Sequence, residues 1–219
     1  MFAALRALFR KPRRGVPEGA SILYSTPSVN DSVGPITRDT TTVRDRMVIH
    51  SDDWRHTELV HAGLARAIQA ELADISTIHQ LHKGASGWSK VHIRQRVPEP
   101  IAGVGIVLAD LAREFAGMTR LKGVGYFDSA GLVDDGFAFT TPGGLQLYGQ
   151  VDPGGNEQLT LVCFEPCILG DREKLRQEVT SLVSFAAGHG LRLVCWNKLC
   201  GLEPNVDEWL HFFETQYHV

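Results

Sequence analysis

The sequence predicts an α+β protein in which one long helix and two or three shorter helices pack on a mostly antiparallel sheet. Two observations support this prediction. Apolar side chains recur at helical spacing over residues 52–83, and residues 120–165 divide into apolar segments separated by turn residues. The first pattern is typical of an amphipathic helix and the second of a β-meander. We expect residues 1–20 to be a basic, flexible tail and residues 21–219 to form a single domain.

The composition is that of an ordinary globular chain. Of its 219 residues, 43% are hydrophobic and 21% are charged, with a formal net charge of −3. This supplies enough apolar material for a core. The slightly acidic balance argues against a nucleic-acid partner, because such proteins usually carry a basic surplus. No apolar run reaches the roughly 18 residues of a transmembrane helix, and four cysteines do not suggest a disulfide scaffold, so we expect a cytoplasmic protein.

The long helix has a start signal and a stop signal. Ser51 or Asp52 can cap its first turn, and Gly84 can end it. Its apolar stripe comprises Val60, Leu64, Ile68, Leu72, Ile75 and Ile78. A helix this one-sided is expected to pack across a sheet.

Histidines on this helix are the first candidate site residues. Glu58 and His61 are spaced to form an acid–histidine pair on one helix face, and His79 and His82 are spaced to share a ligand. His61 and His79 would lie about 27 Å apart along the axis, at about 1.5 Å per residue, so they cannot hold one ion. We favour surface or core histidines over a site, and we expect no metal and no cofactor.

A basic strand face is the second candidate. Residues 89–97 alternate cleanly and predict a half-exposed antiparallel strand with His92, Arg94 and Arg96 on its outward face. Three basic side chains in a row suit a phosphate, a carboxylate or an acidic partner surface. The alternative is a strand that carries charge to discourage edge pairing.

The remaining elements follow from the same criteria. We expect further helices over residues 101–116, 172–188 and 207–217. Strands are expected over residues 46–50, 121–127, 136–141, 145–151, 158–164 and 191–196, the last of them central in the sheet.

Cysteines and aspartates offer two weak metal patterns. Cys163 and Cys167 form one close pair and Cys195 and Cys200 another, which a zinc site could use; we favour free buried cysteines, because the usual C-x2-C knuckle is absent. A loop contains Asp128, Asp134 and Asp135 without the spacing of a calcium loop, so we favour turn chemistry.

Three functional hypotheses remain, because no G-x-S-x-G elbow, P-loop, H-E-x-x-H motif or kinase signature is present. The first is a non-enzymatic protein-binding module, such as a bacterial inhibitor, immunity or adaptor protein, whose partner is another protein. The second is a hydrolase-type enzyme with a histidine-containing site, with or without a metal ion. The third is a membrane-peripheral protein anchored weakly by its basic residues 1–14, although we favour a frayed, solubilising terminus for this segment.

Overall fold

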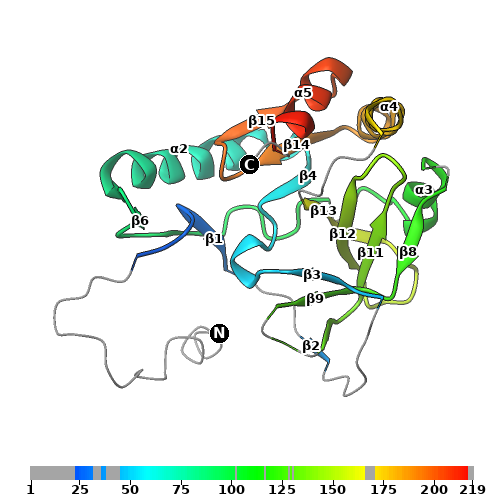
Figure 1. Ribbon diagram of the computed structural model, residues 1–219, viewed down its shortest axis with the longest axis horizontal. Coiled ribbons are helices and arrows are strands. Elements are labelled where there is room, and N and C mark those ends of the chain that lie inside the picture. The colour runs from blue at the N-terminus through cyan, green and yellow to red at the C-terminus, as the bar shows by residue number, and fades with distance from the viewer. Residues whose placement is uncertain are drawn as a thin grey trace.

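A seven-stranded antiparallel sheet forms the centre of the protein. The computed structural model describes residues 23–31, 36–37, 45–101, 103–115, 117–127, 129, 131–165 and 171–216. Across the sheet the strands are β15 (Cys200–Leu202), β14 (Leu191–Cys195), β4 (Thr57–His61), β13 (Leu159–Glu165), β12 (Gln146–Val151), β11 (Gly136–Thr140) and β8 (Thr119–Leu121) (Figure 1). The α+β class and the antiparallel meander are therefore confirmed.

Four α-helices accompany the sheet in the described part of the chain: α2 (Ala65–His82), α3 (Leu108–Arg113), α4 (Arg172–Gly188) and α5 (Val206–Gln216). The predicted bounds of α4 are confirmed and those of α5 differ by one residue at each end. Asp171 starts α4, because its carboxylate accepts the backbone N–H groups of Glu173 and Lys174.

The long helix begins later than the sequence predicts. Residues 51–53 form a short 3-10 helix, η1 (Ser51–Asp53), and β4 follows it as a central strand. Leu59 and Val60 are both fully buried, one on each face of the sheet. Pairing with β13 and β14 and burial on two faces outweigh the local helical spacing, because propensity is a weak prior against tertiary packing.

The predicted helix over residues 101–116 is also wrong in its first half. Among the described residues of this range, only Leu108–Arg113 is helical, and the segment before it pairs with the start of β13 through Val107 and Gln158. Gly103 and Gly105 take φ values of 78° and 80°, which a helix excludes.

Small sheets extend the fold. Two are parallel pairs: β1 (Ser28–Asn30) with β7 (His92–Arg94), and β3 (Met47–Ile49) with β9 (Val124–Tyr126). Two are antiparallel: β2 (Ile36–Thr37) with β10 (Leu132–Val133), and β5 (Lys83–Gly84) with β6 (Gly87–Trp88). The predicted strand at 46–50 is confirmed as β3, whereas the one at 121–127 is divided between β8 and β9.

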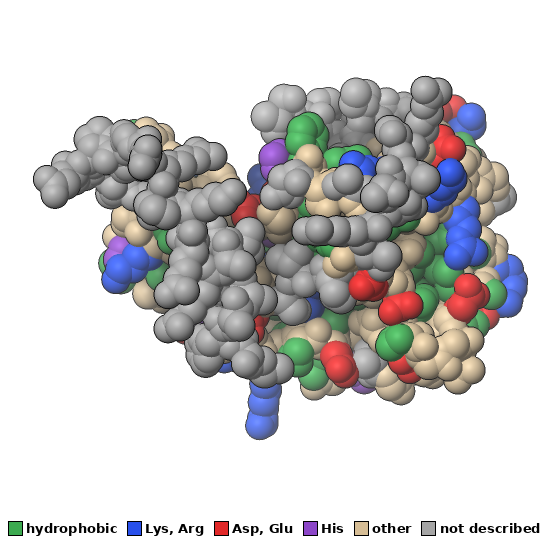
Figure 2. All heavy atoms as spheres, turned by 90° about the horizontal axis from the view of Figure 1, so that it is seen from below, with side chains coloured by type: hydrophobic (Ala, Val, Ile, Leu, Met, Phe, Trp, Pro, Cys, Tyr) green, Lys and Arg blue, Asp and Glu red, His purple; other side chains and the backbone are tan. Residues whose placement is uncertain are grey.

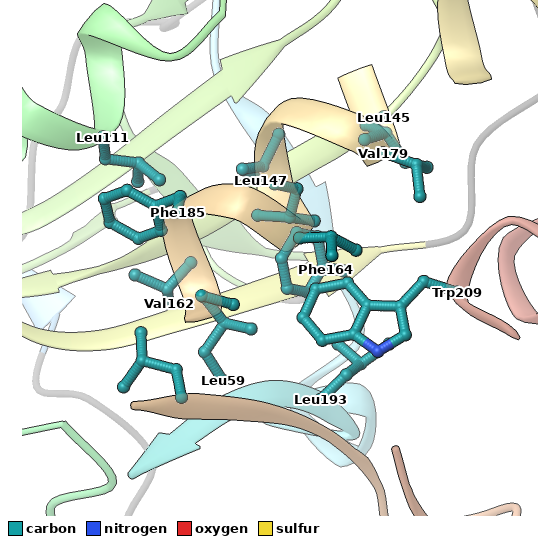
Figure 3. Close-up of a cluster of buried hydrophobic side chains, with 14 of the residues drawn as sticks. Leu59, Leu111, Leu145, Leu147, Val162, Phe164, Val179, Phe185, Leu193 and Trp209 are labelled. Carbon is teal, nitrogen blue, oxygen red and sulfur yellow. The ribbon is translucent and has the colours of Figure 1, made fainter. Parts of the chain in front are cut away.

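The two faces of the sheet are covered differently. Helices α3, α4 and α5 cover one face, and Figure 3 shows side chains of the sheet, such as Leu59, Val162 and Leu193, gathered with Val179 of α4 and Trp209 of α5. On the other face α2 packs over β4 and β14, while β3 and β9 pack over β11 to β13.

No helix in the described ranges combines the length and hydropathy that crossing a membrane requires. The basic segment of residues 1–14 lies outside the described residues, as do Cys167 and Asp128.

Candidate functional site

A cavity of about 470 Å³ lies beside the end of β12 and the start of β13. The β10–β11 turn, the segment that follows β7 and the corner between η1 and β4 complete its wall. Its lining residues are Trp54, Arg55, Pro98, Glu99, Gly103, Asp134, Asp135, Gln150, Val151, Asp152, Pro153, Gln158, Leu159, Thr160 and Leu161. The volume is within the range of ligand-binding pockets.

The cavity wall is acidic. It carries the carboxylates of Glu99, Asp134, Asp135 and Asp152, and among the described residues that line it Arg55 alone is cationic. On the face that is seen from below, Asp and Glu side chains lie on the side of the molecule that carries β11 and β12, with Lys and Arg side chains beside them (Figure 2). The two carboxylates of the β10–β11 turn fit turn chemistry, since Asp135 takes a φ of 55°.

Arg55 does not offset this charge, because it is 4% exposed and paired with Glu58. Its Nε and Nη2 donate to the two Glu58 carboxylate oxygens, at 2.7 and 3.2 Å, and Trp196 Nε1 donates to the same carboxylate at 2.7 Å. Arg55 also donates to the carbonyls of Val97 and Pro98. Burial lowers the pKa of Arg55, but the charge and hydrogen bonds of Glu58 outweigh burial and leave the pKa above its ordinary value.

A second buried arginine holds the corner in place. Arg94 Nη1 and Nη2 donate to the carbonyls of Arg55 and Trp54, at 2.7 and 3.2 Å, and its guanidinium lies 5.3 Å from the centre of the Trp196 ring. Arg55 needs this support because its φ of 62° is uncommon for a residue with a side chain. Burial lowers the pKa of Arg94 to about 10, so the guanidinium remains protonated at neutral pH.

The orientation predicted for the basic strand is wrong. Arg94 is 5% exposed and points into the protein, whereas Ile93, predicted to face inward, is exposed. The strand β7 is short and lies between β1 and α2, so its charged side chains meet buried acceptors on neighbouring elements instead of water.

The other two basic residues of this strand contact α2. His92 Nε2 lies 2.6 Å from Glu71 Oε1, and the backbone N–H of Arg96 donates to Glu71 Oε2 at 3.0 Å. The Arg96 guanidinium pairs with Asp74 at 2.6 Å. His92 and Arg96 thus share Glu71 on α2, whereas Arg94 is bound at the corner between η1 and β4, and a binding role for the three residues stays a prediction.

Glu58 and His61 do not form the predicted pair. They lie three residues apart on β4, and neighbouring side chains of a strand alternate, so the two point to opposite faces. Glu58 is fully buried with Arg55, while His61 Nδ1 accepts the backbone N–H of Gly63 at 3.2 Å.

His79 and His82 have different neighbours. The His79 ring lies 5.7 Å from the Trp88 ring, and the backbone carbonyl of His82 accepts the N–H of Ser89. Both residues lie in the last turn of α2, where they fit the negative end of the helix dipole.

A different histidine cluster lies where η1 meets β4. His56 Nδ1 is 3.2 Å from Asp53 Oδ1 and 2.9 Å from Asn197 Nδ2, and Thr26 donates to Asn197 Oδ1 at 2.8 Å. Nδ1 cannot donate to Asp53 and accept from Asn197 at once, so these two neighbours favour opposite tautomers. Among the described residues, His56 Nε2 is buried without a hydrogen-bond partner.

The pKa values of Asp53 and of Glu165, on which the charge of Asp53 acts, shift in opposite directions. The hydrogen bond from His56 lowers the pKa of Asp53, against the effect of burial. Burial, with a smaller contribution from the charge of Asp53, raises the pKa of Glu165 to about 8. Opposed shifts of neighbouring carboxyl groups are a feature of acid–base sites.

The sheet separates the cysteines of the predicted zinc pattern. Cys163 packs beside Tyr148 on the face that carries β3 and β9, whereas Cys195 and Cys200 pack on the face that carries α4 and α5. Within the described ranges, no group of three or more His, Cys, Asp or Glu side chains is placed to hold a metal ion.

No protein-family model, curated protein or solved structure matches this chain. The function is therefore argued from the site alone. The sequence contained only one signal for the His56 cluster, the short spacing from Asp53 to His56, because Glu165 and Asn197 are brought to it by β13 and β14.

Proposed function

We propose that the protein is a non-enzymatic, cytoplasmic protein-binding module of the bacterial inhibitor, immunity or adaptor type, and that it takes a basic segment of its partner into the acidic cavity. The observation that carries this proposal is the charge of the cavity wall. Four carboxylates line it, and the charge of Arg55 is neutralised by Glu58.

Lysine or arginine side chains suit such a cavity. A guanidinium forms paired, charge-assisted hydrogen bonds with carboxylates, and an ammonium supplies three donors. An acidic cavity also accelerates the encounter with a basic segment through long-range attraction. Binding should therefore weaken as the salt concentration rises.

Affinity capture from native lysate tests this proposal. The site variant combines Glu99→Gln with Asp135→Asn, because asparagine tolerates the positive φ of position 135. The control variant combines Glu173→Gln with Glu208→Gln, which removes the same charge from exposed positions on α4 and α5. A basic protein that is captured by the wild type and the control, but lost by the site variant, supports the proposal. Equal capture by all three proteins contradicts it.

A labelled arginine-rich peptide provides a direct measurement. Fluorescence anisotropy should show at least a tenfold weaker affinity for the site variant than for the control, because two of four carboxylates are removed. Equal affinities would mean that net charge alone attracts the peptide.

The His56 cluster favours a second candidate, a hydrolase-type enzyme. Asp53 is placed to orient the imidazole, the buried His56 Nε2 has no hydrogen-bond partner among the described residues, and Glu165 has a pKa of about 8. Activated esters and phosphoesters are suitable test substrates. Turnover that His56→Gln abolishes and His79→Gln retains would support an enzyme, and turnover that both variants retain would exclude this site.

A further inference from the structure

Two cysteines face each other in the hairpin formed by β14 and β15. Cys195 and Cys200 are direct cross-strand partners and form the register pair that closes the turn over residues 196–199. Direct partners in an antiparallel pair project to the same face of the sheet. Both side chains meet the core cluster under α4 and α5, where Cys195 is buried and Cys200 is half-buried.

This arrangement is compatible with a disulfide. Opposed residues of antiparallel strands have Cα atoms about 4.5–5.5 Å apart, and disulfides span Cα separations of about 4.4–6.8 Å. Cys163 lies on the opposite face and cannot compete.

We propose that Cys195 and Cys200 form a reversible dithiol–disulfide site that is oxidised by a low-molecular-weight disulfide such as oxidised glutathione. The Cys200 thiolate attacks the small disulfide, forms a mixed disulfide and releases one small thiolate. The Cys195 thiolate then attacks the Cys200 sulfur and releases the second small thiolate. The protein loses two electrons and two thiol protons, and the small disulfide gains both as two thiols.

Cys200 is the point of entry, because the Cys195 side chain is buried. Burial, with a smaller contribution from Cys195, raises the pKa of Cys200 to about 11. Since the thiolate is the nucleophile, oxidation is slow at neutral pH and accelerates about tenfold per pH unit between roughly pH 7 and 10.

The disulfide would close the base of a turn that supports the buried polar network. Trp196, next to Cys195, donates to Glu58, and Asn197 contacts His56. Oxidation should therefore slow hydrogen exchange of the turn amides.

Peptide mapping of the full-length protein tests the proposal. After incubation with oxidised glutathione, free thiols are alkylated and the protein is digested with trypsin without reduction. Trypsin cleaves after Arg192 and Lys198, so it separates Cys195, in residues 193–198, from Cys200, in residues 199–219. The expected result is a linked pair of these peptides whose mass is lower than their sum by two hydrogen atoms, and whose yield rises with pH.

Two variants sharpen this test. Cys163→Ser should form the linked peptides as the wild type does. In Cys200→Ser, Cys195 should carry neither a disulfide nor glutathione. Three outcomes would overturn the proposal: both cysteines alkylated after oxidation, Cys200 present as a stable glutathione adduct, or Cys200 joined to residues 123–172, which contain Cys163 and Cys167.

Discussion

The two faces of the central sheet are built on different principles. The face under α4 and α5 has one continuous apolar cluster that runs from β14 to β11. The opposite face has two apolar clusters, one beneath α2 and one beneath β3 and β9. Between them lies a buried polar network around Glu58, Arg55 and Arg94.

The two faces are suited to different roles, one to stability and the other to function. An apolar face is stabilised by burial and is tolerant of conservative exchanges, whereas a buried ionic network is costly to desolvate and sensitive to the loss of any member. Both functional candidates adjoin the polar network: Trp54 and Arg55 line the acidic cavity, and Asp53 and His56 flank them in the chain. We therefore expect the polar face to carry the function.

Glu58→Gln should have the largest effect. It leaves the buried Arg55 without its ion-pair partner and removes the nearby negative charge that favours the charged form of Arg94. Breaking a buried ionic network in this way costs about 3–5 kcal/mol. Urea unfolding should show this loss in the free energy of unfolding.

Trp196→Phe is the comparison variant, since it removes one hydrogen bond to the same carboxylate together with part of a buried ring that lies against Arg94, and it should cost about 1–3 kcal/mol. If Glu58→Gln lowers the free energy of unfolding no more than this variant does, the charge of Glu58 does not stabilise the network. The two faces of the sheet would then not differ in the way described.

Leu182→Ala tests the apolar face. Leu182 is fully buried in α4, and truncation of such a leucine costs about 3 kcal/mol through lost burial and a residual cavity. Because Leu182 is not among the residues that line the acidic cavity, binding of the arginine-rich peptide should keep its wild-type affinity under conditions where the variant is folded. A loss of affinity would show that the two faces are coupled.

Much of the fold could be predicted because local pattern and tertiary packing agree. The turn residues around β11, β12 and β13, the cap at Asp171 and the apolar run of β14 all specify what the structure contains. The prediction was wrong where they disagree. The apolar residues of Thr57–His61 continue the helical spacing of α2. Pairing with two neighbouring strands nevertheless makes this segment a central strand.

The candidate site could be predicted far less well, because it depends on contacts between segments distant in sequence. Arg94 was predicted to face outward since strand alternation alone assigns its face; the carbonyls of Trp54 and Arg55 that draw it inward belong to another element. The acidic cavity likewise joins Glu99 to turns more than 30 residues later, at Asp134 and beyond.

Glu165→Gln should alter the pH dependence of stability. The folded protein favours the protonated carboxyl, whose pKa is raised from 4.5 to about 8. The stabilisation is complete below about pH 4.5, is lost as the pH rises to about 8 and is then constant. One pKa unit corresponds to about 1.4 kcal/mol, and solvent reduces the effect at this half-buried site, so we expect a loss on the order of 2 kcal/mol for the wild type.

Thermal unfolding from pH 5 to pH 9 makes this measurement. The amide introduced by Glu165→Gln is neutral throughout, so the variant should become more stable than the wild type above about pH 8. Parallel pH profiles for the two proteins would show that Glu165 titrates as an ordinary surface carboxyl.

Arg96→Ala should have the smallest effect on stability. It also tests whether the predicted basic strand still contributes to partner binding. The Arg96 guanidinium is partly exposed and paired with Asp74, and such surface pairs contribute about 0–1 kcal/mol. The backbone N–H that donates to Glu71 is kept in the variant, so the contact between β7 and α2 should persist. If the acidic cavity binds the partner, affinity capture should be unchanged. Loss of capture with intact stability would instead move the interface from the cavity to the side of the molecule where β7 meets α2.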